Sequence, residues 1–163
     1  MTQIAARPRV VLDCNVLVQA ISNAAGPGGR CLQLLEQGVI GVYVSRAALK
    51  ELRLVLNYPS VRQKLPDLND ALIETFTQRL SFRATLVRHV PHVFDYPRAH
   101  QDEPYIDLAA AADADYLVSR DRDLLALATD HSILGKQFRQ RFPRLLVLNP
   151  VAFLKLVAPA PGG

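Results

Sequence analysis

The sequence lacks the residues and motifs that mark several common protein classes. Only two of its 163 residues are cysteines, which excludes a disulfide framework and a cysteine-rich zinc site. No apolar run reaches the roughly 18 residues that a membrane-spanning helix needs. There is no glycine-rich loop before a Lys-Ser or Lys-Thr pair and no Gly-x-Ser-x-Gly, which argues against a P-loop and a serine-hydrolase elbow. The four histidines lack the spacing of zinc ligands, and we expect them in loops or on the surface.

Length and composition predict one globular domain. Half of the residues are hydrophobic and 21% are charged, a balance typical of folded proteins. A chain of this length buries about two-thirds of its unfolded surface and needs no disulfide or structural metal to fold. We expect residues 1–157 to form the domain and residues 158–163 to form a flexible tail. Asp13 interrupts the first apolar run, which argues against a secretion signal. Two cysteines that form no disulfide framework favour a reducing, cytoplasmic location.

Charge is unevenly distributed along the chain. The formal net charge is +4, yet eight of the fifteen acidic residues lie within residues 95–123. These residues are Asp95, Asp102, Glu103, Asp107, Asp113, Asp115, Asp121 and Asp123. Such a segment suits an acidic metal pocket within a surface that attracts phosphates, and it is equally consistent with a solvated acidic face.

The hydrophobic pattern predicts strands that alternate with helices. The expected strands are residues 9–18 (running into a turn), 39–44, 84–89, 116–118 and 145–148. A short helix is expected to end at residue 38, after the apolar residues that begin at residue 32. The other expected helices span about residues 45–57, 69–80, 102–112, 121–128 and 151–157. Residues 26–29 and 90–101 are expected to be loops. This alternation predicts an α/β domain around a mostly parallel sheet.

Acidic residues follow the expected strands where functional sites of such sheets form. Asp13 ends the first strand, Asp121 follows the strand at 116–118, and Asp102 opens a helix. Each could simply cap a helix or turn, but together they converge on one rim of the sheet. Glu51 is a fourth candidate, although a surface salt bridge explains it equally well. Clustered carboxylates without thiols or a histidine pattern select Mg²⁺ or Mn²⁺.

Three stretches resemble the PIN domain nucleases, especially the branch of toxin components of toxin–antitoxin pairs. They are VVLDCNVLV, VSRAALKELRLVL and QDEPYIDLAAAADADYLVSRDRDLL, and the likeness covers about residues 9–155. The resemblance implies a three-layer α/β/α sandwich with a central, mostly parallel sheet. It assigns the catalytic acidic quartet to Asp13, Glu51, Asp102 and Asp121, of which the three aspartates hold the metal. It assigns supporting roles to Asn15, Ser119 and Asp123.

This sequence departs from the resembled pattern at two places. Arg120 stands where members often have Gly between the hydroxyl residue and the last acid. Glu103 and Pro104 stand where members often have Asn or Asp followed by Lys. These differences bear on substrate contacts and metal geometry, while all four acids are retained.

The function expected from these features is a Mg²⁺- or Mn²⁺-dependent ribonuclease that cleaves single-stranded RNA. Arg46, Lys50 and Arg53 are candidates for contacting the RNA backbone, or are ordinary solvated charges. The resemblance also implies a homodimer and a small antitoxin protein as partner. One alternative is a non-catalytic RNA- or partner-binding module. Another is a phosphatase of the haloacid dehalogenase type, which needs an aspartate where Asn15 stands.

Overall fold

The computed structural model describes residues 6–158 and contains one open parallel sheet with the strand order β3-β2-β1-β4-β5. In chain order the strands are β1 (Arg9–Leu12), β2 (Gly41–Val44), β3 (Thr85–Leu86), β4 (Tyr116–Val118) and β5 (Leu146–Leu148). The chain moves outward from β1 to β3 and then returns to the other side of β1. The order therefore reverses between β1 and β4, and ligands of open α/β sheets bind at the carboxyl ends of the strands at such a point.

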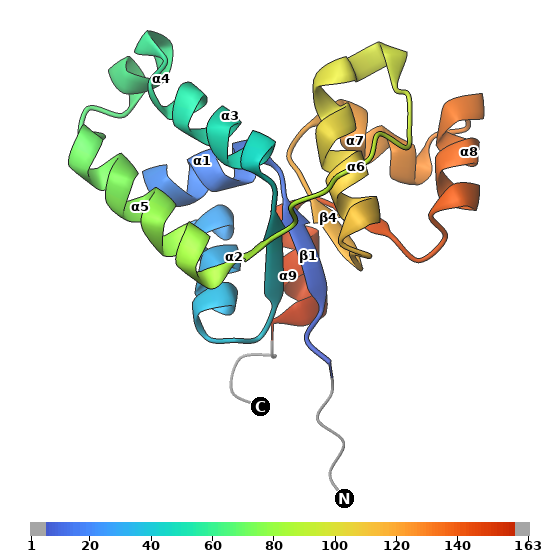
Figure 1. Ribbon diagram of the computed structural model, residues 1–163, viewed down its shortest axis with the longest axis horizontal. Coiled ribbons are helices and arrows are strands. Elements are labelled where there is room, and N and C mark those ends of the chain that lie inside the picture. Colours follow the sequence, from blue (N-terminus) through green and yellow to red (C-terminus); the bar gives the residue numbers. More distant parts are fainter. Residues whose placement is uncertain (1–5, 159–163) are drawn as a thin grey trace, which may run out of the picture.

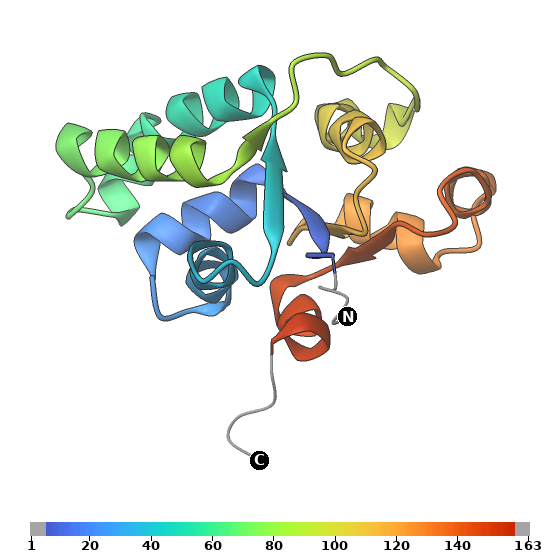
Figure 2. The same cartoon turned by 60° about the horizontal axis from the view of Figure 1, so that its bottom comes forward.

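Helices cover both faces of the sheet, as the resemblance predicts. They are α1 (Cys14–Ser22), α2 (Pro27–Glu36), α3 (Arg46–Leu56), α4 (Pro59–Lys64), α5 (Asp70–Arg83), the 3-10 helix η1 (Pro97–Asp102), α6 (Glu103–Ala111), α7 (Arg122–Thr129), α8 (Ile133–Arg141) and α9 (Pro150–Val157). Helices α1, α2 and α9 lie on one face and α6, α7 and α8 on the other (Figures 1 and 2). Helices α3, α4 and α5 lie on the same side of the sheet as α1 and α2 (Figures 1 and 2). The expected three-layer sandwich is confirmed.

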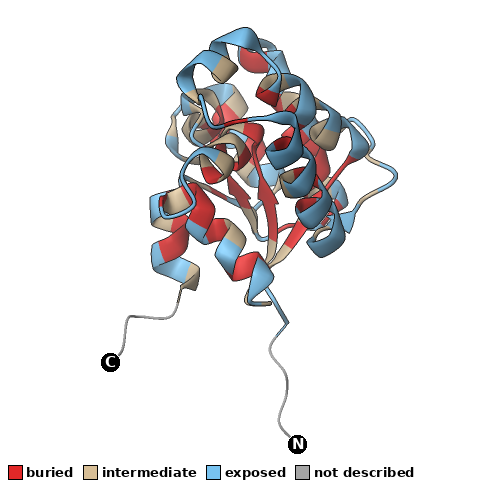
Figure 3. Ribbon diagram, turned by 90° about the vertical axis from the view of Figure 1, so that its left-hand side faces the viewer, coloured by how far each residue is buried: buried red, intermediate tan, exposed pale blue. Residues whose placement is uncertain are grey.

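The core lies between these layers, where the strands are red in Figure 3. Val10 and Val11 of β1 and Leu117 of β4 are fully buried, because the central strands of a parallel sheet are covered on both faces. No helix within residues 6–158 has the length and apolar character to cross a membrane. Both Cys14 and Cys31 are buried free thiols, as expected for small apolar side chains.

Several boundaries predicted from the sequence were wrong. The first strand ends at Leu12 rather than continuing to residue 18, because Asp13 accepts a hydrogen bond from the Cys14 N–H and starts α1. The strand expected at 84–89 is reduced to Thr85–Leu86. The short helices α4, η1 and α8 were not predicted, since few of their residues are apolar. The expected tail lies outside the described residues, apart from Ala158.

The loop expected at residues 26–29 is another error, because α2 begins at Pro27. Gly28 and Gly29 are helical and buried against α1 and the turn that follows it. A Cβ on Gly28 would lie 2.7 Å from the Val16 carbonyl oxygen, and one on Gly29 would lie 2.1 Å from the Ala24 carbonyl oxygen. These glycines permit two backbones to approach closely, rather than marking a turn.

Replacing Gly29 with alanine should therefore destabilise the fold. The added methyl group would collide with rigid backbone, and overpacking of this kind costs about 1–3 kcal/mol. Gly41→Ala is the matched control, since its Cβ would meet no atom closer than 3.7 Å. Urea unfolding of both variants measures the difference; equal midpoints for Gly29→Ala and the wild type would contradict this packing.

Candidate metal centre

Three aspartates from distant parts of the chain meet at the carboxyl edge of the sheet. Asp13 follows β1, Asp121 follows β4, and Asp102 lies at the junction of η1 and α6. One carboxylate oxygen from each lies within 4.8 Å of the other two. Asp13 is 5% exposed and Asp102 is 3% exposed. The structure thus brings together the three residues that were predicted to hold a metal.

A network of hydrogen bonds fixes the Asp13 carboxylate. Its Oδ1 accepts from the Cys14 N–H at 2.7 Å, and its Oδ2 accepts from the Ser119 hydroxyl at 2.6 Å. The Asn15 amide also donates to Oδ2 at 3.3 Å. The backbone N–H of Asp13 donates to the Val118 carbonyl at 2.9 Å, which continues the β1–β4 pairing. The predicted supporting residues Asn15 and Ser119 therefore contact Asp13.

Ser119 also links the first acid to the last. While its hydroxyl donates to Asp13, its oxygen accepts from the Asp121 N–H at 2.9 Å. The Asp121 Oδ1 in turn accepts from the Asp123 N–H at 2.8 Å, capping α7. Arg120 donates its backbone N–H to Asn15 Oδ1 at 3.2 Å. Because this bond uses the backbone, the arginine side chain that replaces glycine here does not interrupt the network.

Asp102 differs from the other two acids because part of its carboxylate has no donor. It stands at the N-cap position of α6 but makes no side-chain capping bond. Its buried Oδ2 has no hydrogen-bond partner within residues 6–158. An unpaired buried carboxylate oxygen is costly unless a cation meets it. Oxygen-only donors that include an orphaned oxygen fit a hard divalent cation such as Mg²⁺ or Mn²⁺.

Burial, and to a lesser extent the nearby carboxylates, raises the pKa values of Asp13 and Asp102. Burial, more than the nearby charges of Asp121 and Glu51, raises the pKa of Asp13 to about 6. Burial and then the adjacent Asp121 raise the pKa of Asp102 to about 8. Both shifts favour the protonated acid, so the metal-free cluster resists carrying its full negative charge at neutral pH.

Glu51 lies beside this group rather than within it. It projects from α3, where its Oε2 accepts a hydrogen bond from the Tyr105 hydroxyl at 2.8 Å. Glu51, the three aspartates and Tyr105 line one continuous cleft of about 720 Å³. Sequence patterns had indicated Glu51 but not Tyr105, whose contact with it spans 54 residues of sequence.

The remaining predicted residues lie outside the cleft. The carboxylate of Asp123 pairs with Arg98 at 2.8 Å. Arg53 pairs with Glu74 of α5 at 3.3 Å, and neither it nor Arg46 or Lys50 lines the cleft.

The cations that do line the cleft are Lys64 of α4 and Arg120. Lys64 escaped the sequence analysis because α4 itself was not predicted. Arg120 was noticed only as a departure from the resembled pattern, and no motif signal marked either residue as a cleft cation.

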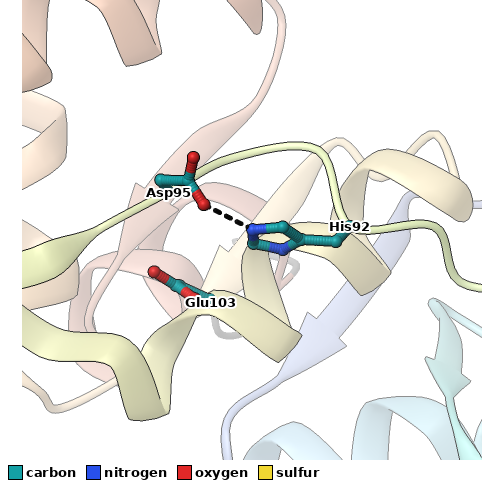
Figure 4. Close-up of side chains that lie close together, drawn as sticks. All are labelled: His92, Asp95 and Glu103. Atoms are coloured by element: carbon teal, nitrogen blue, oxygen red, sulfur yellow. Dashed lines mark hydrogen bonds and ion pairs between the residues drawn. The ribbon is translucent and has the colours of Figure 1, made fainter.

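A second group of ionisable side chains fastens the segment 90–101 to α6. His92, Asp95 and Glu103 offer ligand-type atoms within 4.8 Å of one another (Figure 4). The histidine nitrogens lie 2.6 Å from Asp95 and 2.8 Å from the nearly buried Asp107. Hydrogen bonding to Asp107, and then to Asp95, raises the pKa of His92 to about 9. A protonated His92 between two carboxylates is therefore an ion-paired clamp.

Comparison with known proteins agrees with this architecture. The family model described as "PIN domain" matches residues 9–123, a range that contains Asp13, Glu51, Asp102 and Asp121. An uncharacterized protein of Methanocaldococcus jannaschii is 28% identical over 127 residues, which are 77% of this chain and 79% of that relative.

We predict that the metal-free fold loses stability as pH rises. An unfolded aspartate loses its proton near pH 4, whereas folded Asp102 keeps it until about pH 8, so the folded state binds more protons in this window. In EDTA, Asp102→Asn should melt higher than the wild type above pH 8, and this advantage should disappear near pH 4.

Thermal melts across this range, with Asp113→Asn as the control, measure the effect. Asp113 is exposed and has a φ of 50°, which asparagine tolerates. A wild type that is as stable as Asp102→Asn at high pH would show that the carboxylates do not oppose folding.

We also predict a pH-dependent contribution from the His92 clamp. Because its pKa is raised from 6.5 to about 9, the stabilisation is complete below 6.5 and is lost as pH rises through about 9. The melting temperature of His92→Gln should thus fall furthest below that of the wild type in mild acid and approach it in alkali. His131→Gln, an exposed position, is the control. A gap that is constant with pH would mean that His92 acts through packing alone.

Proposed function

The chain belongs to the PIN domain family, and on this premise we propose that it is a divalent-metal-dependent endoribonuclease that cleaves single-stranded RNA. The observation that carries the proposal is the group of Asp13, Asp102 and Asp121, of which the first two are buried, with its orphaned Asp102 oxygen. Two buried carboxylates and a half-buried third, gathered at a topological switch point with one oxygen left unpaired, are a costly arrangement for a purely structural role.

Each residue of the group has a distinct part in the proposed reaction. Asp13, Asp102 and Asp121 would hold Mg²⁺ or Mn²⁺ through their oxygens. When bound, such an ion lowers the pKa of a water and neutralises charge on the phosphate. Glu51, oriented by Tyr105, would complete the site or accept a proton from the attacking water. Ser119 and Asn15 would keep Asp13 aimed at the ion, since both donate to its Oδ2.

The surroundings of the cleft support a nucleic-acid substrate. Arg120 and Lys64 line it, and the protein carries a net charge of +4. Cations beside an acidic metal site attract a polyanion without neutralising the ligands. Arg46 and Lys50 are exposed on α3, and contacts between RNA and Arg46, Lys50 and Arg53 remain part of the proposal as a path outside the cleft.

Biological context is also proposed from the resemblance of the sequence motifs. We propose a toxin component of a toxin–antitoxin pair, acting in the cytoplasm as a homodimer with a small antitoxin protein as its partner. The neighbouring reading frame tests this role, because a gene pair without a small partner protein would count against it. Sedimentation measurements test the dimer, and a monomer at micromolar concentration would count against that part.

The two alternative functions make different demands on the same residues. A haloacid dehalogenase-type phosphatase needs a general acid at position 15, but Asn15 cannot ionise and its amide is already bonded to Asp13 and Arg120. A non-catalytic RNA-binding module would retain affinity for RNA without cleaving it. Cleavage that depends on metal therefore separates the proposal from both alternatives.

Replacing Asp102 with asparagine should abolish cleavage while preserving the fold. The substitution keeps the shape of the side chain but removes a charge, and we expect at least about a hundredfold loss of cleavage rate in limiting Mn²⁺. Mn²⁺ at ten times its dissociation constant should increase the free energy of unfolding of the wild type by about 1.4 kcal/mol. That is a rise of roughly 3–6 °C in melting temperature, and it should shrink in the variant.

Gel-based cleavage of labelled RNA and melts in Mn²⁺ measure both effects, with Asp113→Asn as the matched control. Wild-type cleavage by Asp102→Asn would remove this residue from the site. An RNA that is bound but never cut, at any Mn²⁺ or Mg²⁺ concentration, would favour the non-catalytic module.

A further inference from the structure

The cleft extends well beyond the acids along the length of α1. Three helices build it, each presenting residues one turn apart. Helix α1 contributes Asn15, Val18, Gln19 and Ser22, α3 contributes Glu51 and Val55, and α4 contributes Val61 and Lys64, followed by Leu65 directly after the helix. Helix α1 has nine residues and is therefore about 13 Å long. The metal-binding acids occupy only the end at its N-terminus.

The part of the cleft beyond Glu51, which we name the outer cleft, has an apolar wall. Val18, Val55, Val61 and Leu65 line it, and all four side chains are partly exposed rather than buried in the core. The whole cleft, at about 720 Å³, lies within the range of about 300–1,000 Å³ for pockets that hold small ligands. A metal ion and its waters need only the acidic end, so the outer cleft is available for another group.

Positive charge is present along the same cleft. Arg120 adjoins Asp121, and Lys64 lies on α4 among the apolar residues. Neither side chain forms an ion pair with any acid in residues 6–158. By contrast, Arg53, Arg62 and Arg79 on nearby helices are all paired with carboxylates. The two free cations can therefore meet phosphates without breaking an existing interaction.

We propose that the outer cleft binds one unpaired nucleotide next to the scissile phosphate, with its base against the apolar wall and its distal phosphate at Lys64. This inference rests on the proposed ribonuclease function and adds a recognition site to it. The faces of all bases are apolar, and contact with Val and Leu offers no hydrogen-bond code at the wall. The subsite would therefore select an unpaired base in preference to a particular base identity.

Exclusion of duplex RNA follows from the same geometry. A paired base is stacked between its neighbours and presents only its edge in a groove. To reach a wall between α1, α3 and α4, the base must leave the stack, which costs a few kcal/mol in a duplex and much less in a single strand. The subsite thus links cleavage to unpaired RNA by the cost of freeing one base.

Removing single bases from the substrate tests this proposal. A short unstructured RNA with a mapped cleavage position is compared with copies that carry one abasic nucleotide at each position around the cut. Loss of the base that enters the outer cleft should raise KM about five- to tenfold, on one side of the scissile bond only. The double variant Val55→Thr/Val61→Thr makes the wall polar at nearly constant shape. In this variant, the same abasic substitution should raise KM by less than about twofold relative to the intact RNA.

Val151→Thr on α9, where the side chain is 50% exposed and outside the cleft, is the matched control. Its response to the abasic substrates should equal that of the wild type. An equal penalty at every abasic position, or a penalty unchanged in the double variant, would overturn the subsite.

Binding measurements in EDTA keep this test independent of cleavage. Fluorescence anisotropy of the same RNA should give a slope of log affinity against log salt that falls by about 0.7 in Lys64→Gln, the value for one lost phosphate contact on a single strand. Lys136→Gln on α8 is the control and should leave the slope unchanged.

The two proposals can therefore fail separately. One outcome would retain the nuclease and reject the subsite. In that case the protein cleaves RNA, every abasic position raises KM equally, and Lys64→Gln leaves the slope of log affinity against log salt unchanged. The opposite outcome would retain the subsite and reject the nuclease. In that case Lys64→Gln reduces the slope of log affinity against log salt and the protein prefers the single strand to its duplex, but no divalent metal supports cleavage.

Discussion

The cost of burying neighbouring carboxylates at one edge of the sheet, to which their mutual repulsion adds, is the constraint on which the rest of this structure depends. Two charges about 5 Å apart repel by roughly 3 kcal/mol at an effective dielectric near 20, and Asp13, Asp102 and Asp121 approach at least this closely. The fold offsets the cost for Asp13 with the Ser119 hydroxyl and the Cys14 N–H, and for Asp121 with the Asp123 N–H. It leaves one Asp102 oxygen unsatisfied, and a divalent cation would supply the missing partner.

The sheet topology explains how such distant residues can be held so rigidly. Asp13 and Ser119 are 106 residues apart, but the parallel pairing of β1 with β4 places Leu12 opposite Val118. The next residue on each strand then stands at the same edge, and the hydroxyl meets the carboxylate. A shift in this register would separate the pair, so the buried strands that stabilise the fold also set the geometry of the candidate site.

Local patterns made part of this arrangement predictable. The apolar run before Asp13 predicted the central strand, and the helix expected at residues 45–57 is α3, which begins after Ser45, whose hydroxyl oxygen accepts from the Ala48 N–H. Whether Asp102 is a cap or a ligand could not be decided locally, because its missing capping bond and its burial arise from tertiary packing. Helix α4 and therefore Lys64 were missed because a short polar helix has almost no hydrophobic period. The clamp of His92 on Asp107 joins residues 15 positions apart, across a loop whose path no local pattern specifies.

Anomalous diffraction from crystals grown with Mn²⁺ is the most direct test of the central claim that these acids form a metal centre. The account predicts a manganese peak in contact with oxygens of Asp13, Asp102 and Asp121, including the Asp102 oxygen that lacks a donor. The same experiment on Asp102→Asn should show a weaker peak or none. A fully occupied peak at His92, Asp95 and Glu103 with none between the three aspartates would contradict the account, as would a well-ordered wild-type site without manganese at saturating concentration.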